Sequence, residues 1–263
     1  MNHSIENNAT LLNIDDGVAS ISLNQPEKHN AFDDTVIAEL LQHLDTIKQQ
    51  RDIRVVVLRA EGKHFCAGAD LAWMKRMATL NYQQNLDDAK NLALLMANLN
   101  ALPQPTIARV QGAAYGGAIG LIACCDIALA SDNARFCLSE VKLGLAPATI
   151  GPYVIAAMGA RRCRQLFLTA EVFSAEHASD YGLVHRVVPL DTLDDQLANV
   201  IKQISQAGPN ATIAAKKLIL DLNNDNDDPS AMTSALIAEL RVSEEGQEGL
   251  KAFFDKRAPS WRS

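Results

Sequence analysis

The sequence predicts an α/β core with parallel strand pairing, followed by a C-terminal part that is entirely helical. Short apolar runs alternate with amphipathic stretches of helical period up to about Val188, as in a chain of βα units. The run 55–58, VVVL, is apolar without alternation, which is typical of a strand buried on both faces. From Leu190 onward every periodic stretch has the helical period.

The expected elements of the core follow from this periodicity and from turn residues. Asp15-Asp16-Gly17 separates two apolar runs and is typical of a hairpin turn. Asp33 or Asp34 can cap the first helix, and Pro103 and Pro105 end the second. The expected elements are a hairpin (11–14 and 18–23), a helix (33–50), a buried strand (55–58), a helix (82–101) and three further strands (106–110, 127–130 and 134–138).

The C-terminal part is expected to contain four helices. The stretch 223–229, NNDNDDP, is typical of a solvated turn between two of them. We divide the chain into an α/β core at 1–195 and a helical region at 196–263. The four expected helices are 193–206, 211–222, 230–244 and 248–256.

Composition is that of an ordinary soluble globular enzyme, and a reducing, cytoplasmic location is expected. The chain has 263 residues, of which 48% are hydrophobic, and a net charge of -7, which gives no electrostatic footprint for nucleic acid. Its five cysteines lack metal-ligand spacing, so we expect no metal. The longest apolar stretch, 116–130, is interrupted by Asp126 and is too short to span a membrane.

Two glycine-bearing segments, 65–71 (FCAGADL) and 112–120 (GAAYGGAIG), follow apolar strands. Small residues let the backbone approach a ligand closely, and Asp70 can cap the helix that follows the first segment. The second segment lacks GxGxxG spacing and is not a dinucleotide fingerprint. Close helix packing through small residues is an alternative reason for it.

The order of these segments resembles the enoyl-CoA hydratase/isomerase (crotonase) family. F-x-A-G-A-D-L is followed by Q-G-x-A-x-G-G, by Cys125-Asp126-Ile127, and then by Phe136 and Glu140. The flanking stretches 24–32 and 248–257 also match. The resemblance runs from about Leu11 to Trp261.

The resemblance implies a crotonase (ClpP-like) fold of repeated ββα units, whose helical C-terminal region packs against a neighbouring subunit in a homotrimer or a dimer of trimers. It implies an acyl-CoA thioester substrate and no separate cofactor. The catalytic residues that it implies are Glu140 and the backbone N–H groups of Ala69 and Gly117, which would form an oxyanion hole. Fixed amide donors stabilise the negative charge that builds on a thioester oxygen when an enolate forms.

Substrate-binding residues also follow from the resemblance. The nucleotide end would meet Phe253 and Lys256 of an adjoining tail or subunit. A solvated surface charge is the alternative for Lys28, Lys256 and Arg257. The expected binding residues are Lys28, Ala67, Gly68, Asp70, Leu71, Tyr115, Gly116, Phe253 and Lys256.

The sequence departs from the two-glutamate pattern of the best-known hydratases. Glu140 is present, but Gly120 stands where the other glutamate would be. A single glutamate must then carry the proton transfer, helped by a pKa that its apolar neighbours, such as Leu143 and Leu145, would raise. Several isomerases of the family use one glutamate, so double-bond isomerisation remains an alternative.

The chain most resembles the methylglutaconyl-CoA and carboxygeranoyl-CoA hydratases, so a branched substrate such as 3-methylglutaconyl-CoA is expected. Lys75 and Arg76 could meet its second carboxylate or could face solvent. Tyr115 and Tyr153 could orient the water that Gly120 cannot hold. Cys66 has no partner base in the sequence and is not expected to be a nucleophile. A non-catalytic RNA-binding protein is the remote alternative, and the acidic balance counts against it.

Overall fold

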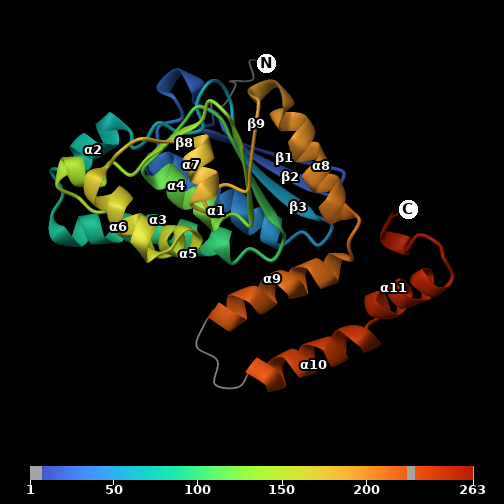
Figure 1. Ribbon diagram of the computed structural model, residues 1–263. Coiled ribbons are helices and arrows are strands. Elements are labelled where there is room, and N and C mark those ends of the chain that lie inside the picture. Colours follow the sequence, from blue (N-terminus) through green and yellow to red (C-terminus); the bar gives the residue numbers. More distant parts are fainter. Residues whose placement is uncertain (1–7, 224–228, 263) are drawn as a thin grey trace, which may run out of the picture.

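The computed structural model describes residues 8–223 and 229–262 and confirms the α/β class (Figure 1). Its main sheet has six strands in the order β1-β2-β3-β4-β6-β9. β1 and β2 form the predicted antiparallel hairpin, and the other neighbouring pairs of this sheet are parallel. The strands are β1 (Thr10–Asp15), β2 (Val18–Leu23), β3 (Val55–Ala60), β4 (Thr106–Val110), β6 (Ile127–Ser131) and β9 (Arg186–Val188).

A smaller sheet has three short strands in the order β5-β7-β8. β4 leads into β5 and then α4, and β6 leads into β7 and then α5, so a ββα unit recurs along the chain. β7 was predicted, as the longer stretch 134–138, whereas β5 and β8 were not. Strands of two or three residues are too short to show a periodicity. The elements are β5 (Ala113–Tyr115), β7 (Arg135–Cys137), β8 (Phe173–Ser174), α4 (Gly117–Cys124) and α5 (Gly151–Met158).

The main sheet is buried on both faces, which explains the unbroken apolar run in β3. Val56 and Leu58 belong to the larger apolar cluster, which also contains the buried side chains of α1, α3 and α4. Val55 and Val57 point to the other face and belong to a second cluster, which includes residues of α8. Successive side chains of a strand point to opposite faces, so a strand between two apolar layers must be apolar throughout.

Four helices of the core, α1, α2, α3 and α7, begin at residues whose side chains cap them. Asp33 caps α1, because its side chain accepts a hydrogen bond from the N–H of Val36 at 2.8 Å. Asn81 and Gln84 form a capping box at the start of α3. The helices are α1 (Asp34–Lys48), α2 (Leu71–Met77), α3 (Tyr82–Asn100), α6 (Ala160–Thr169), α7 (Ala175–Asp180) and α8 (Leu193–Ser205).

Helix α8 packs on the main sheet, and the three helices after it extend away from the sheet (Figure 1). Leu193, Leu197 and Val200 of α8 are buried in the second apolar cluster. The boundary that the sequence analysis placed between the α/β core (1–195) and the helical region (196–263) falls inside this helix. The three extending helices are α9 (Pro209–Asn223), α10 (Pro229–Val242) and α11 (Glu244–Phe254).

All four predicted C-terminal helices are present, with ends shifted by a few residues. The largest shift is at α11, which begins at Glu244 because Ser243 caps it by accepting a hydrogen bond from the N–H of Gly246. Most of the predicted turn at 223–229 lies outside the described residues. Within the described part of the chain, no helix has the length and apolarity needed to cross a membrane.

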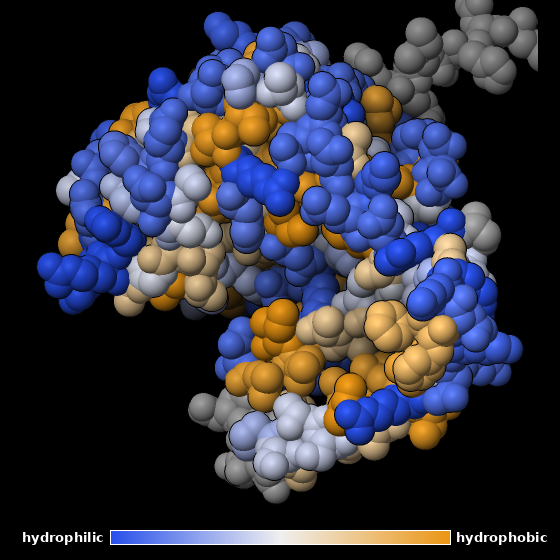
Figure 2. Space-filling view, turned by 45° about the vertical axis from the view of Figure 1, so that its right-hand side comes forward, coloured by the Kyte–Doolittle hydropathy of each residue, from blue (hydrophilic) through white to orange (hydrophobic). Residues whose placement is uncertain are grey.

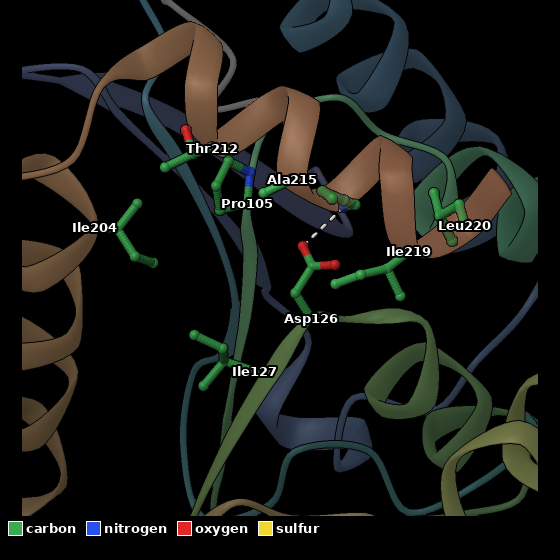
Figure 3. A pocket seen from close by; sticks show the side chains of 9 residues that line it. Pro105, Asp126, Ile127, Ile204, Thr212, Ala215, Ile219 and Leu220 are labelled. Atoms are coloured by element: carbon green, nitrogen blue, oxygen red, sulfur yellow. Dashed lines mark hydrogen bonds and ion pairs between the residues drawn. The ribbon is translucent and has the colours of Figure 1, made fainter. Parts of the chain in front are cut away.

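An ion pair anchors α9 to the core. The Nζ of Lys216 lies 2.8 Å from Oδ2 of Asp126 and 3.2 Å from the carbonyl oxygen of Gln104. Asp126 Oδ2 also accepts hydrogen bonds from the backbone N–H and the hydroxyl of Thr106. Figure 3 shows Ile127 of β6, Ile204 of α8 and Ile219 of α9 around the small apolar pocket beside this pair. Asp126 therefore has a structural role, joining β4, β6 and α9.

Candidate active site

A cavity of about 810 Å³ is bounded by α2, α3, the first residue of α4 and the segment 140–150. It brings together the three residues predicted to be catalytic, Ala69, Gly117 and Glu140. The remaining lining residues are mostly apolar: Phe32, Trp73, Met74, Met77, Ala78, Leu80, Asn85, Asp88, Ala89, Leu92, Leu143, Leu145, Ala146, Pro147, Thr149 and Ile150.

The loop before α2 places Ala69 on the wall of this cavity. The two residues that flank Ala69 are hydrogen-bonded to the backbone of Phe32. The N–H of Phe32 donates to the carbonyl of Gly68 at 2.8 Å, and the carbonyl of Phe32 accepts from the N–H of Asp70 at 2.9 Å. The side chain of Asp70 caps α2 by accepting from the N–H groups of Ala72 and Trp73. Among the described residues the Ala69 N–H has no acceptor, so it is available to a ligand.

The start of α4 supplies a second amide. Gly116 is the N-cap, with φ 58° and ψ -123°, a conformation that favours glycine. Gly117 is the first helical residue, and its N–H donates to no described acceptor. The first N–H groups of a helix have no intrahelical partner and lie at the positive end of the helix dipole. Two residues with unpaired backbone N–H groups therefore line one cavity.

Glu140 lies beside the start of α4. A Cβ atom placed on Gly116 would be 3.4 Å from Oε1 of Glu140, so a larger residue at 116 would crowd the carboxylate. Glu140 begins the 3-10 turn η2 (Glu140–Leu143), and its carbonyl accepts from the N–H groups of Gly144 and Leu145. The turn directs its side chain into the cavity.

The Glu140 carboxyl is partly desolvated. Its Oε2 atom is buried and has no hydrogen-bond partner among the described residues. Burial raises the pKa of Glu140 above its usual range, because the charged form loses solvation. A partly buried carboxyl with a free oxygen and a raised pKa is suited to accept and return a proton.

The structure explains the absence of a second carboxylate at Gly120. A Cβ atom at this position would lie 2.2 Å from Cγ2 and 2.7 Å from Cβ of Ile150, and 3.2 Å from Sδ of Met96. Ile150 and Met96 are buried in the core. The space of the missing glutamate is therefore filled by apolar side chains.

The predicted water-orienting and carboxylate-binding residues do not line the cavity. Tyr115 lies in β5, next to Gly68, and Tyr153 lies in α5. Arg76 forms a surface ion pair with Asp34, with 2.6 Å between Nη2 and Oδ1. Lys75 is exposed on α2. These positions depend on how the helices pack, which the order of residues along the chain does not reveal.

The expected binding residues near the loop are on the surface beside the cavity. Lys28 is exposed at the end of the 3-10 turn η1 (Pro26–Lys28), and Leu71 is 74% exposed at the start of α2. The N–H of Ala67 donates to the carbonyl of His29. Phe253 of α11 is 77% exposed, and Lys256 follows that helix. In Figure 1 α11 lies at the far side of the molecule from α2.

Sequence reasoning missed the polar residues of the cavity wall. Trp73 Nε1 donates to Oδ1 of Asp88 at 3.4 Å, and the side chain of Asn85 donates to the carbonyls of Leu80 and Asn81. Asn85 and Asp88 are three residues apart on α3, a spacing that places them on one face. This spacing was the feature of the sequence from which the two polar wall residues could have been predicted. No feature of the sequence around Thr149 indicated that this residue lines the cavity.

Cys66 and His64, beside the glycine loop, have structural surroundings. Burial raises the pKa of the Cys66 thiol to about 12, which keeps it protonated at neutral pH. Nδ1 of His64 accepts a hydrogen bond from the N–H of Ala113 at 3.0 Å and so ties the loop to β5. Among residues 8–223 and 229–262, no group of three or more His, Cys, Asp or Glu side chains is arranged to hold a metal ion.

Comparison with known proteins identifies the family of the chain. Residues 13–263 match the family model described as "Enoyl-CoA hydratase/isomerase". A trans-2-decenoyl-[acyl-carrier-protein] isomerase of Streptococcus mutans is 30% identical over 254 residues, which are 95% of this chain and 97% of the relative.

Two solved structures are also similar. An enoyl-CoA hydratase of Shewanella pealeana is 46% identical, with a TM-score of 0.93 and 97% of each chain covered. Pseudomonas aeruginosa AtuE is 34% identical, with a TM-score of 0.92, covering 97% of this chain and 100% of that one. The chain therefore belongs to the enoyl-CoA hydratase/isomerase family and has the crotonase fold.

Proposed function

We propose that the chain hydrates a 2-enoyl-CoA thioester, with Ala69 and Gly117 as the oxyanion hole and Glu140 as the proton-transfer group. One observation carries this proposal. Two residues whose backbone N–H groups have no described acceptor share one cavity with a partly buried carboxyl whose Oε2 is also unpaired. The match to the family along most of the chain supports an acyl-CoA substrate.

The reaction needs only one carboxylate. Glu140 removes a proton from water while the water oxygen forms a bond to C3 of the substrate. The C2–C3 double-bond electrons move toward the thioester, and the resulting enolate oxygen is held by the N–H groups of Ala69 and Gly117. Protonated Glu140 then gives its proton to C2, which restores the thioester carbonyl and the carboxylate.

The electrostatic part of this mechanism is substantial. Fixed donors aimed at a developing oxyanion need no reorganisation, and loss of one costs about 3–4 kcal/mol of transition-state stabilisation. The raised pKa of Glu140 makes its protonated form a weaker acid than an ordinary carboxylic acid. A pKa closer to neutrality brings both proton transfers nearer to thermoneutral.

Labelled water tests the reaction. In water enriched in oxygen-18, hydration gives a hydroxyacyl thioester that carries one labelled oxygen, and the conjugated absorbance of the enoyl group disappears. Glu140→Gln, which keeps the shape of the side chain, should lower the rate at least about a thousandfold. An unchanged rate in this variant would remove Glu140 from the mechanism.

Double-bond isomerisation is the second candidate, and the packing at Gly120 favours it. With Ile150 and Met96 in the place of a second carboxylate, one glutamate can move a proton between two carbons. The Streptococcus mutans relative is named an isomerase. An isomer has the mass of the substrate and contains no labelled oxygen, so the same experiment separates the two reactions.

The acyl group is proposed to be branched, as in 3-methylglutaconyl-CoA. The apolar side chains of Trp73, Met77 and Leu92 on the cavity wall support a branched alkyl group. The described lining contains no Lys, Arg or His that could pair with a second carboxylate. We therefore expect the branch, rather than the carboxylate, to dominate recognition within a single chain.

We further propose that the chain forms a homotrimer or a dimer of trimers through its C-terminal helices. Val242, Phe253 and Phe254 are each more than 70% exposed. Figure 2 shows hydrophobic side chains gathered on the part of the molecule formed by α9, α10 and α11. Such a surface is typical of an interface between subunits. In an assembly, Phe253 and Lys256 could reach the nucleotide of a substrate bound to a neighbour. Light scattering on the purified protein measures the assembly size.

A further inference from the structure

The proposed hydration requires a group that holds the attacking water, and the usual second glutamate has no room. Glu140 Oε2 can accept one hydrogen bond from this water. A water held by a single hydrogen bond still rotates freely, so its oxygen lone pair is not directed at C3. A second hydrogen-bonding partner on the cavity wall would fix its orientation.

Few polar side chains line the cavity. Among the described residues they are Trp73, Asn85, Asp88, Glu140 and Thr149. The indole N–H of Trp73 is directed at Asp88, and the side-chain amide of Asn85 is directed at two backbone carbonyls. Within this described set, the side chains of Glu140 and Thr149 form no hydrogen bond, and Oδ1 of Asn85 and Oδ2 of Asp88 are also without a partner.

Positions along α3 separate Asp88 from the space at Gly120, where the second glutamate would stand. Met96 Sδ borders the space at Gly120, where a Cβ atom would be 3.2 Å away. Asp88 lies eight residues before Met96, which corresponds to roughly 12 Å along a helix axis. Asn85 lies almost another turn further. Both residues belong to the end of the cavity away from Gly120.

Thr149 is at the correct end. It directly precedes Ile150, whose side chain fills the space at Gly120 and also lines the cavity. The turn that carries Thr149 is fixed by hydrogen bonds from Ala148 N to Ala146 O at 2.7 Å and from Gly151 N to Ala148 O at 3.3 Å. The Thr149 N–H, like its hydroxyl, has no partner among the described residues. A threonine in a fixed turn loses little further freedom when it binds water.

We infer that Thr149 is the positioning residue for water in this active site, taking the place of the second glutamate. The inference rests on the proposed hydration. The water donates one hydrogen bond to Glu140 and the other to Oγ1 of Thr149, so that a lone pair faces C3. The O–H bond to Glu140 breaks as the C–O bond forms. The O–H bond at Thr149 is retained in the product hydroxyl, and Thr149 itself is unchanged.

Matched threonine variants test this role. Thr149→Val removes the hydroxyl and keeps the branched shape, whereas Thr149→Ser keeps the hydroxyl. Thr46→Val is the control. Thr46 lies on α1, away from the cavity, and its hydroxyl donates only to the carbonyl of Gln42. Each protein is assayed for labelled-oxygen incorporation into 3-methylcrotonyl-CoA. Each is also assayed for exchange of the C2 protons of butyryl-CoA with deuterated water, which needs the oxyanion hole and Glu140 but no attacking water.

We expect Thr149→Val to lower kcat for hydration by about 10- to 100-fold, while KM changes by less than about threefold. Proton exchange should stay within about threefold of the wild-type rate. Thr149→Ser should recover most of the hydration, and Thr46→Val should match the wild type.

Two results would overturn the inference while leaving hydration intact. Thr149→Val could hydrate as fast as Thr46→Val, or its proton exchange could fall as far as its hydration, which indicates a structural role. If the wild-type protein incorporates no labelled oxygen into any enoyl thioester, hydration itself is wrong, and the role of Thr149 is refuted with it.

Discussion

Replacement of Gly120 by alanine tests directly whether packing excludes the second glutamate. Gly120 lies inside α4, where a glycine-to-alanine change by itself stabilises a helix by about 1 kcal/mol. Here the new methyl group would be 2.2 Å from Cγ2 and 2.7 Å from Cβ of Ile150. Overpacking of this kind costs about 1–3 kcal/mol. The net expectation is a loss of up to about 2 kcal/mol in the free energy of unfolding.

Urea unfolding followed by circular dichroism measures this loss. Gly151→Ala is the matched control, because a Cβ atom at Gly151, the first residue of α5, would meet nothing within 4 Å. The double variant Gly120→Ala with Ile150→Ala should be more stable than the sum of the two single changes predicts, since the smaller side chain makes room. If Gly120→Ala is as stable as Gly151→Ala, the steric explanation is refuted.

The remaining predictions concern the carboxyl, the C-terminal anchor and the acyl group. Because burial raises the pKa of Glu140, kcat/KM for hydration should fall at a higher pH than an ordinary glutamate would produce as the solution is acidified, and a pH–rate profile measures this limb. A raised folded-state pKa stabilises the fold below the unfolded-state pKa, and this contribution is lost as pH rises through the folded-state value, so Glu140→Gln should raise the free energy of unfolding at neutral pH; a lower value would contradict the desolvation. Lys216→Met should cost about 1–3 kcal/mol and increase hydrogen exchange in α9, because the Lys216 side chain is only 9% exposed and its ion pair with Asp126 is lost; unchanged exchange would show that the pair is not an anchor. 3-Methylcrotonyl-CoA and 3-methylglutaconyl-CoA differ by one carboxylate, and we expect their kcat/KM values to agree within about tenfold; a larger preference for the second would reveal a cation supplied by a neighbouring subunit.

Much of the fold was predictable because its signals are local. Asp33 caps the first helix through a hydrogen bond to Val36, three residues away. Asp15-Asp16-Gly17 forms its turn through its own backbone preferences. The run at 55–58 records the burial of β3 on both faces. Two strands of the second sheet, β5 and β8, escaped prediction, because two or three residues form a strand only when a neighbouring strand is already in place.

The candidate site was predicted in part. The glycine loops and Glu140 lie on one cavity, as the order of motifs implied. The prediction that Tyr115 or Tyr153 would orient water is not supported, since neither side chain lines the cavity. Lys75 and Arg76 likewise lie outside it. Whether a side chain on a helix faces a cavity or solvent depends on how that helix packs against segments far away in the sequence.

The sequence by itself determined the α/β core, the helical C-terminal part, and the pairing of two glycine loops with one glutamate. The first two depend on residues only a few positions apart, which interact in any conformation that forms the element. The third follows from the order of family motifs along the chain, because Ala69, Gly117 and Glu140 are far apart in the sequence. Only the tertiary structure decided that Ile150 and Met96 occupy the space at Gly120, and that Thr149 lies on the cavity wall. These contacts join segments 24 or more residues apart, and close packing, which has no local pattern, determines which side chains meet.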